Sequence, residues 1–344
     1  MDYKKKYKKY KRRFISLKRE VNKRKNAIFM LCMLKEHYVL GACIAAHCHR
    51  HYLDKLNYHV DLVVICDNFI YKNYESTLSK YFDKVINVGL RTIQLSNRYL
   101  FAKGKYTWIQ HSLTKWECLK YEEYYKILFL DVDILPNHIS FYKLFNFNTP
   151  AFHNLHIKKK CINSKPFNYE AQESYEKYIF KYFEKYGSMD GGICLLKPNM
   201  NTYHDYVEYT NKIYNDGLYS HHLSSPDETS LFYFFAKKKE PMYDICTDYA
   251  VIPWDDVDLN EVARGYNFRS YIKPWIKPKF LSWPEEVVWR DLYDKMDKKG
   301  NIEIIFRNAL VNEFDNYMNL PYKKQKRLYS NKFVKKDKNL LNKI

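Results

Sequence analysis

Residues 126–136, KILFLDVDILP, decide the expected fold. A short apolar run that ends in acids and a proline predicts a buried central strand of an α/β sheet. Ligands of open α/β folds bind at the carboxyl edge of such strands, where Asp131 and Asp133 would lie. If the strand continues through Asp133, both carboxylates face one spot and suit a hard divalent cation. The alternative is that one acid caps the following turn and the other is solvated.

Apolar runs and helical spacing outside this stretch predict a mostly parallel, doubly wound sheet flanked by helices. The expected strands before it are residues 27–34, 61–66 and 84–88, and the expected helices are 38–51 and 110–121. After it come a turn with paired glycines and a strand (188–198), then helices at 202–214 and 223–235. Strands and loops rich in Trp and Pro are expected up to about residue 290.

The ends of the chain differ in composition from its middle. Residues 1–25 form a basic tail without helical apolar spacing, so we expect a flexible segment. A single α/β domain is expected over residues 26–290, with an insertion or lid at 153–187 that is rich in Lys, Tyr and Asn. Residues 291–344 are a C-terminal extension that again ends in a basic tail.

The formal charge of +19 is weak evidence for an anionic partner. Part of the excess lies in the terminal runs, and 34 Tyr together with abundant Lys, Asn and Ile indicate an AT-rich genome, such as that of a large DNA virus or an AT-rich microbe. We therefore do not expect nucleic acid as a partner.

The cysteines and apolar runs indicate the cytoplasm, which for a viral protein means the host cytoplasm or the virion. The chain has eight cysteines and no CxxC pair, and Cys32, Cys66 and Cys194 lie in apolar stretches typical of reduced core residues. The basic start is not followed by a signal-peptide apolar region, and no apolar run near it is long enough to cross a bilayer.

Four further patterns each allow a structural and a functional interpretation. The segment from Cys43 to His51, with His47, Cys48 and His49 between, offers metal ligands at helical spacing, but a helix also needs apolar fillers. Asp190-Gly191-Gly192 is either a tight turn or a close approach to a ligand. Asp227-Glu228 at a helix start is either catalytic or only favourable to the helix dipole. Lys273-Pro274-Trp275 is either a phosphate clamp or a surface lysine beside a packing tryptophan.

In order and spacing these patterns resemble the retaining family 8 glycosyltransferases, the glycogenin-like enzymes of the GT-A fold. The resemblance covers residues 27 to about 277. It is carried by the following segments: Tyr38-Val39-Leu40-Gly41-Ala42, Leu113-Thr114-Lys115, Leu130-Asp131-Val132-Asp133, Asp190-Gly191-Gly192, Asp227-Glu228 and Lys273-Pro274-Trp275. Six loose motifs in the right order are far more specific than any one of them.

The resemblance implies a UDP-sugar donor, a divalent cation (Mn²⁺ or Mg²⁺), and a glycan or protein acceptor, or the protein itself. A homodimer stays open. The implied metal ligands are Asp131, Asp133 and Asn267, and the implied catalytic residues are Asp190, Asp227 and Glu228. The implied donor-binding residues are Cys32, Met33, Tyr38, Lys115, Asp131, Val132, Asp133, Gly191, Gly192, Ser270 and Lys273.

The sequence departs from the family pattern at four positions. Counted back from Lys273, Asn267 stands where the family has a metal-binding His, and Ser270 where it has a Gly. Asp190 replaces a neutral Asn, and Glu228 replaces a neutral Gln, so the expected site is more acidic.

Two alternatives from other classes remain. A phosphatase of the haloacid dehalogenase type also has a strand that ends in Asp-x-Asp, but here three strands precede it and Leu135 stands where that motif has Thr or Val. The other alternative is an inactive glycosyltransferase-like protein that binds anionic surfaces or nucleic acid through its basic tails.

Overall fold

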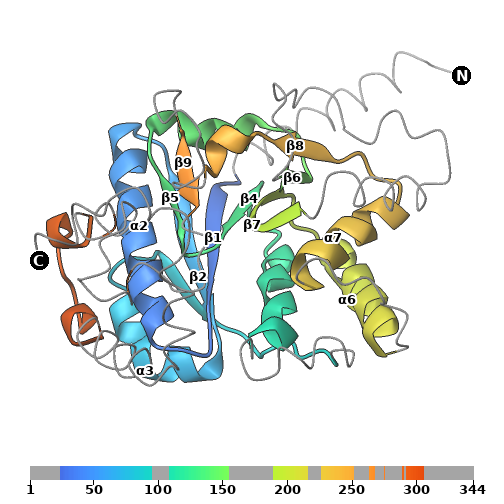
Figure 1. Ribbon diagram of the computed structural model, residues 1–344, viewed down its shortest axis with the longest axis horizontal. Helices are drawn as coiled ribbons and strands as arrows, with labels where there is room; N and C mark the ends of the chain where they lie inside the picture. The colour runs from blue at the N-terminus through green and yellow to red at the C-terminus, as the bar shows by residue number, and fades with distance from the viewer. Residues whose placement is uncertain are drawn as a thin grey trace, which may run out of the picture.

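Strand β1 (Asn26–Cys32) lies inside a seven-stranded sheet of the order β3-β2-β1-β4-β7-β6-β8 (Figure 1). The structure is a computed structural model that describes residues 24–94, 108–154, 189–215, 226–251, 263–267, 275, 289 and 292–305. The other strands of this sheet are β2 (Val60–Cys66), β3 (Lys84–Asn87), β4 (Ile127–Leu130), β6 (Ala151–Asn154), β7 (Met189–Leu196) and β8 (Tyr243–Ile245).

Four of the six strand pairings are parallel, so the predicted mostly parallel α/β sheet is confirmed. Strand β7 is the exception, because it runs antiparallel to both β4 and β6. A second sheet of two antiparallel strands joins β5 (Ile134–Pro136) to β9 (Gly265–Asn267).

Helices cover both faces of the large sheet (Figure 1). The helical elements are α2 (His37–Lys55), α3 (Asn68–Leu78), η1 (Ile109–Lys120), η2 (Ile139–Asn146), α6 (Met200–Asn215), α7 (Pro226–Lys237) and η3 (Thr247–Tyr249). Along β1, Ile28 and Met30 pack on the α2 and α3 side, whereas Phe29 and Leu31 pack on the side of η1, α6 and α7. This alternation follows from the two-residue period of a strand, and it explains why β1 is apolar without interruption.

Three expectations about the elements are wrong in detail. The Asp-x-Asp strand does not continue through Asp133, because β4 ends at Leu130 and a turn separates it from β5. The helix expected at residues 110–121 is a 3₁₀ helix, η1. The first two residues of the expected insertion, His153 and Asn154, belong to β6.

The cysteine prediction holds for the core but not for every cysteine. Cys32, Cys66 and Cys194 are free and buried, and burial raises the pKa of each thiol. Cys246 is disulfide-bonded, so the expectation of reduced cysteines is wrong for this residue. None of the described helices is long and apolar enough to cross a membrane. The tails and most of the expected insertion lie outside the described residues.

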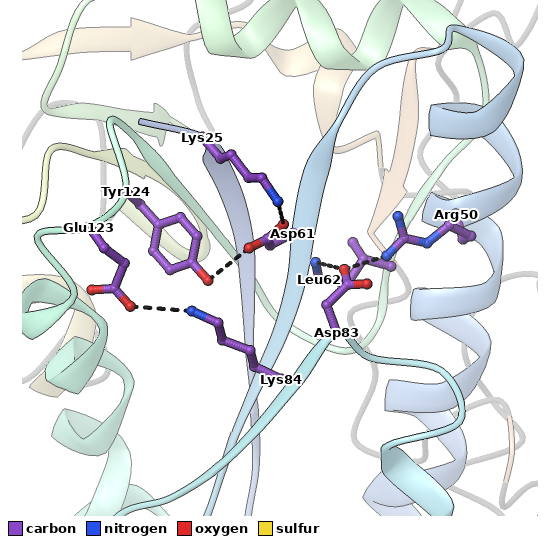
Figure 2. A network of polar contacts seen from close by, with 8 residues as sticks. All are labelled: Lys25, Arg50, Asp61, Leu62, Asp83, Lys84, Glu123 and Tyr124. Atoms are coloured by element: carbon purple, nitrogen blue, oxygen red, sulfur yellow. Dashed lines mark hydrogen bonds and ion pairs between the residues drawn. The ribbon is translucent and has the colours of Figure 1, made fainter. Parts of the chain in front are cut away.

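A polar network ties the strands together at the edge of the sheet where β2 and β3 begin (Figure 2). Asp61 accepts hydrogen bonds from Lys25 (3.3 Å) and Tyr124 (3.2 Å). Asp83 accepts from the Leu62 amide at 2.7 Å and pairs with Arg50 of α2. In a parallel sheet the carboxyl ends lie at the other edge, so these charges are structural and remote from the expected ligand edge.

We predict that His49 makes stability fall with acidity. Its ring is fully buried between α2 and η2, with Nδ1 3.0 Å from the Tyr142 hydroxyl, and burial lowers its pKa to about 3. The unfolded chain therefore binds a proton near pH 6.5 that the folded protein does not, and the folded state loses about 1.4 kcal/mol per pH unit below that point. Between pH 7 and 5, the free energy of unfolding of His49→Gln should fall by about 2 kcal/mol less than that of wild type, as measured by chemical denaturation.

The control for this experiment is His51→Gln, at an exposed histidine of the same helix. Asp131 and Asp244 titrate with raised pKa values of about 6 and act in the opposite direction, so only the difference from wild type isolates His49. Parallel pH curves for wild type and His49→Gln would contradict the prediction.

Candidate active site

The two aspartates of the Asp-x-Asp motif lie in the turn between β4 and β5, at the carboxyl edge of the sheet. The Ile134 amide donates to the Asp131 carbonyl at 3.0 Å, which closes the turn, and the Asp131 amide donates to the Gly192 carbonyl of β7 at 2.7 Å. Asp133 is 6% exposed, whereas the Asp131 side chain keeps 37% of its surface. Asp131 is therefore surrounded by protein yet open to a ligand on one side, and the turn rather than strand alternation sets its direction.

Lys115 of η1 joins three of the predicted motifs. Its Nζ lies 2.9 Å from Asp131 Oδ1 and 2.8 Å from Asp227 Oδ2, and it also contacts the Gly191 carbonyl at 3.5 Å. Burial by itself lowers the pKa of Lys115, but the two carboxylates together raise it by more. The pKa of Lys115 therefore lies well above its usual range. Lys115 is thus a buried cation that holds the metal motif and the acid pair at a fixed distance.

Asp227 and Glu228 occupy the first turn of α7, where acids favour the positive end of the helix dipole. Asp227 is 1% exposed, and its backbone carbonyl accepts a hydrogen bond from Trp116 Nε1 at 3.1 Å. Glu228 is half-buried. The dipole interpretation is correct but incomplete, because the Asp227 side chain is also aimed at Lys115.

The glycine pair lets β7 approach α7 closely. A Cβ on Gly191 would lie 2.5 Å from Glu228 Cγ, and one on Gly192 would lie 2.9 Å from Asp190 Oδ1 and 3.2 Å from Asp131 Oδ2. Within the same strand, Asp190 Oδ1 accepts a hydrogen bond from the Gly192 amide at 2.9 Å. The tight-turn interpretation of Asp190-Gly191-Gly192 is wrong, because all three residues lie within strand β7. The close approach in the structure is to α7, and a close approach to a ligand stays a prediction.

Asn267 is brought to this site by the pairing of β9 with β5, in which it faces Ile134, the residue after Asp133. Its Nδ2 donates to Asp190 Oδ2 at 2.8 Å, and the residue is 3% exposed. The contact explains how a position so distant in sequence reaches the Asp-x-Asp turn.

The turn after β1 is held by an aspartate that the sequence reasoning missed. Asp67 is 3% exposed, accepts from the Leu34 amide at 2.7 Å and caps α3 by accepting from the Ile70 amide at 2.8 Å. Leu34 has φ of 69°, a left-handed conformation that a leucine rarely adopts without such support. Cys32 and Met33 precede it and are buried. An Asp directly before a helix is a capping signal, which was available in the sequence.

Gly41 and Trp275 are far apart in sequence but pack directly against each other. A Cβ on Gly41 would lie 2.6 Å from Trp275 Cη2, the Trp275 indole donates to His37 Nδ1 at 3.2 Å, and Tyr38 contacts the same indole edge-on. The first and last motifs of the resemblance thus meet around one buried tryptophan. Contact between Tyr38 and the uracil base of the UDP-sugar remains a prediction.

We predict that Gly41→Ala destabilises the protein by about 1–3 kcal/mol, because the rigid indole cannot yield to the added methyl. Gly89→Ala is the matched control, since a Cβ there would meet nothing within 4 Å. Urea denaturation measures both, and equal midpoints for the two variants would contradict the prediction.

Two predicted donor-binding residues, Ser270 and Lys273, lie outside the described residues. The helical Cys and His segment does not form a metal site: Cys43, Cys48 and His49 are buried in the core and His51 is exposed. In the described part of the chain, no group of three or more His, Cys, Asp or Glu side chains could hold a metal ion.

The charges of the site nevertheless favour a cation. Its described residues include four aspartates (Asp131, Asp133, Asp190 and Asp227) and one ammonium, that of Lys115, which pairs with Asp131 and Asp227. Carboxylates are ligands for hard divalent cations, and Mg²⁺ is commonly held by one or two of them together with substrate phosphates. The residues therefore fit a cation that binds with a phosphorylated ligand, rather than one held in an all-protein cage.

Comparisons with known proteins agree on the fold. No family model matches the chain. It is 26% identical over 169 residues to "Uncharacterized protein R707" of Acanthamoeba polyphaga mimivirus, a match over 49% of this chain and 53% of that protein, so the chain spans about half of that relative. The galactosyltransferase LgtC, solved in complex with donor and acceptor sugar analogs, has 14% identity and a TM-score of 0.52 over 83% of this chain and all of its own.

Two further solved structures are similar to this chain with lower TM-scores. The bifunctional glycosyltransferase WbbM has a TM-score of 0.47, 11% identity, and coverage of 83% of this chain and 52% of its own. Mouse xyloside xylosyltransferase 1 has a TM-score of 0.38, 12% identity, and coverage of 71% of this chain and 97% of its own. The predicted fold class is confirmed: the chain has the GT-A fold of glycosyltransferases.

Proposed function

We propose that the protein is a retaining glycosyltransferase of the family 8 type, which moves a sugar from a UDP-sugar to a glycan or protein acceptor. The observation that carries the proposal is the Lys115 ammonium within 2.9 Å of both Asp131 and Asp227, at the carboxyl edge of a GT-A sheet. Three motifs from separate parts of the sequence converge there, which the phosphatase alternative does not explain. We assign the activity to residues 26–290.

In this reaction the bond between the sugar's anomeric carbon and the diphosphate breaks, and UDP leaves with the electron pair. A bond from the acceptor hydroxyl oxygen to the same carbon forms, and the hydroxyl proton passes to the leaving diphosphate. Asp131 and Asp133, with the Asn267 side-chain oxygen, would hold a divalent cation, Mn²⁺ or Mg²⁺, which neutralises the charge that develops on the leaving diphosphate.

Side chains of the protein act on both partners of the breaking bond, the diphosphate and the anomeric carbon. Lys115 adds a fixed positive charge next to the diphosphate and pairs with Asp227 at 2.8 Å. Asp227, with Glu228 beside it, stabilises the positive charge at the anomeric carbon or attacks it transiently. The backbone of Gly191 and Gly192 gives the sugar room against β7, and Tyr38, Cys32 and Met33 border the base. Val132, Ser270 and Lys273 complete the proposed donor site.

The test is UDP release by the purified full chain with Mn²⁺ and a panel of UDP-sugars, with and without EDTA. Release from one donor, lost on chelation and restored by Mn²⁺, is the expected result. Asp133→Asn should abolish release without unfolding the protein, and it is cleaner than a change at Asp131, which would also unpair Lys115. Asp61→Asn, which alters an aspartate of the opposite edge (Figure 2), is the control.

Release from no donor, together with no binding of UDP by calorimetry, would refute the proposal. The inactive, anion-binding alternative would then stand. It predicts that removal of residues 1–25 and the last twenty residues abolishes retention on an anionic matrix, whereas a transferase should keep its donor turnover.

A further inference from the structure

A buried histidine lies directly behind the Asp190 carboxylate. His153 of β6 is 2% exposed, and in the described part of the structure neither of its ring nitrogens has a hydrogen-bond partner. Its Nδ1 is 3.5 Å from Asp190 Oδ2, just beyond a normal hydrogen bond. A buried polar group without a partner destabilises a fold by about 1–3 kcal/mol, so the position of His153 requires an explanation.

An irregularity in the sheet brings the two side chains together. Phe152 pairs with Cys194, but the next residue, His153, pairs with Asp190, so the three residues 191–193 of β7 have no counterpart on β6. Such bulges are common next to active sites, where they redirect a side chain. The pairing makes His153 and Asp190 cross-strand neighbours, which places their side chains within reach of one another.

Asn267 is the third member of this arrangement. Its Nδ2 donates to Asp190 Oδ2 at 2.8 Å, and all three residues are at most 5% exposed. An ionised carboxylate only accepts hydrogen bonds, so Asp190 fixes which way the amide of Asn267 turns. The nitrogen faces Asp190, and the oxygen is the atom left for a ligand.

We propose that His153 is a positioning residue that acts through Asp190 on Asn267. When donor and cation bind, His153 Nδ1–H donates to Asp190 Oδ2, and Asp190 holds the Asn267 amide with its oxygen toward the cation. Hydrogen bonds of this kind are often long in a free enzyme and tighten when the ligand binds. The role of Asn267 as a ligand rests on the proposed function, whereas the order His153–Asp190–Asn267 rests on the contacts alone.

The experiment compares His153→Leu, His153→Gln, Asp190→Asn and the double variant that combines His153→Leu with Asp190→Asn. Mn²⁺ affinity in the presence of UDP is measured by electron paramagnetic resonance, alongside donor turnover. Loss of a residue that supports a metal ligand lowers affinity or activity about 10–100-fold, and we expect this for His153→Leu. His153→Gln should recover most of it, because its amide nitrogen can donate, and the double variant should be no worse than Asp190→Asn.

A matched control is Tyr58→Phe, which removes one hydrogen bond, that from Asn26 Nδ2 at 2.8 Å, at the start of β1. It should change neither readout. Wild-type Mn²⁺ affinity in His153→Leu, or a Gln variant as defective as the Leu variant, would overturn the proposal.

A second readout, the NMR resonances of the Asn267 side-chain amide, does not depend on the proposed function. They should shift in both His153→Leu and Asp190→Asn, whether or not the protein turns over a UDP-sugar. Unchanged Asn267 resonances in His153→Leu would overturn the positioning role, even in an active enzyme. If the resonances shift in a protein that neither binds Mn²⁺ nor releases UDP, the proposed function is refuted. The positioning of Asn267 by His153 through Asp190 would still hold.

Discussion

Lys115→Met should destabilise the protein by about 3–5 kcal/mol and abolish donor turnover. Methionine fills the same space but leaves Asp131 and Asp227 next to one another without a cation, and removal of one partner from a buried ion pair has an effect of this size. Lys115 is 7% exposed and Asp227 is 1% exposed, so water cannot take the place of the ammonium. Urea denaturation and UDP release measure the two effects.

Lys84→Met is the matched control for this change. Lys84 pairs with Glu123 at 3.4 Å, but both side chains are about half exposed, at 44% and 51% (Figure 2). An exposed ion pair contributes about 0–1 kcal/mol, so this variant should remain close to wild type. Equal denaturation midpoints for the two lysine variants would contradict the buried role of Lys115.

A second substitution separates stability from chemistry at the same site. In a Lys115→Met background, Asp227→Asn removes the buried charge that lost its partner, so the double variant should regain part of the lost stability. It should not regain turnover, because both Lys115 and Asp227 are needed to act on the donor. Recovery of turnover in the double variant would exclude Asp227 from the reaction.

Gly191→Ala should lower donor turnover about 100-fold with a smaller effect on stability, about 1–3 kcal/mol. The new methyl would lie 2.5 Å from Glu228 Cγ and 3.2 Å from Asp227 Oδ2, so the start of α7 has to move away from β7. A displacement of about 1 Å at a reacting group is enough for a loss of this size. The measurement is kcat for UDP release together with the denaturation midpoint.

The control is again Gly89→Ala, where the added methyl meets no atom within 4 Å. Both variants lose the same backbone freedom, so a difference between them reports the contact with Glu228. If Gly191→Ala turned over donor like Gly89→Ala, the acid pair of α7 would have no part in the reaction.

Most of the fold could be predicted from local patterns. The apolar runs that became β1, β2 and β4 are long enough to be recognised as buried strands, and their order along the chain specifies a parallel sheet. Asp131 and Asp227 could be singled out because polar residues directly after strands or at helix starts fall at one edge of such a sheet, and Asp190 because two glycines follow it. That these three aspartates lie close together could be inferred only from the resemblance to family 8 glycosyltransferases.

The errors occurred where tertiary contacts override local preference. The sequence of residues 127–135 favours one strand, but the hydrogen bond from the Ile134 amide to the Asp131 carbonyl and the pairing of β5 with β9 bend it into two. No local signal marks His153, because its position depends on a bulge that needs β7 beside it. The close fit of Gly41 to Trp275 likewise joins residues that no sequence window contains together.

The sequence by itself determined the α/β class, the buried strands and the chemical types of the groups at the carboxyl edge, because these follow from hydrophobic period and from residue chemistry. Only the tertiary structure decided which charges meet. Lys115 is drawn between Asp131 and Asp227 because a buried ammonium requires carboxylate partners. Asp190 meets His153 and Asn267 because three strands from distant parts of the chain converge at one bulge.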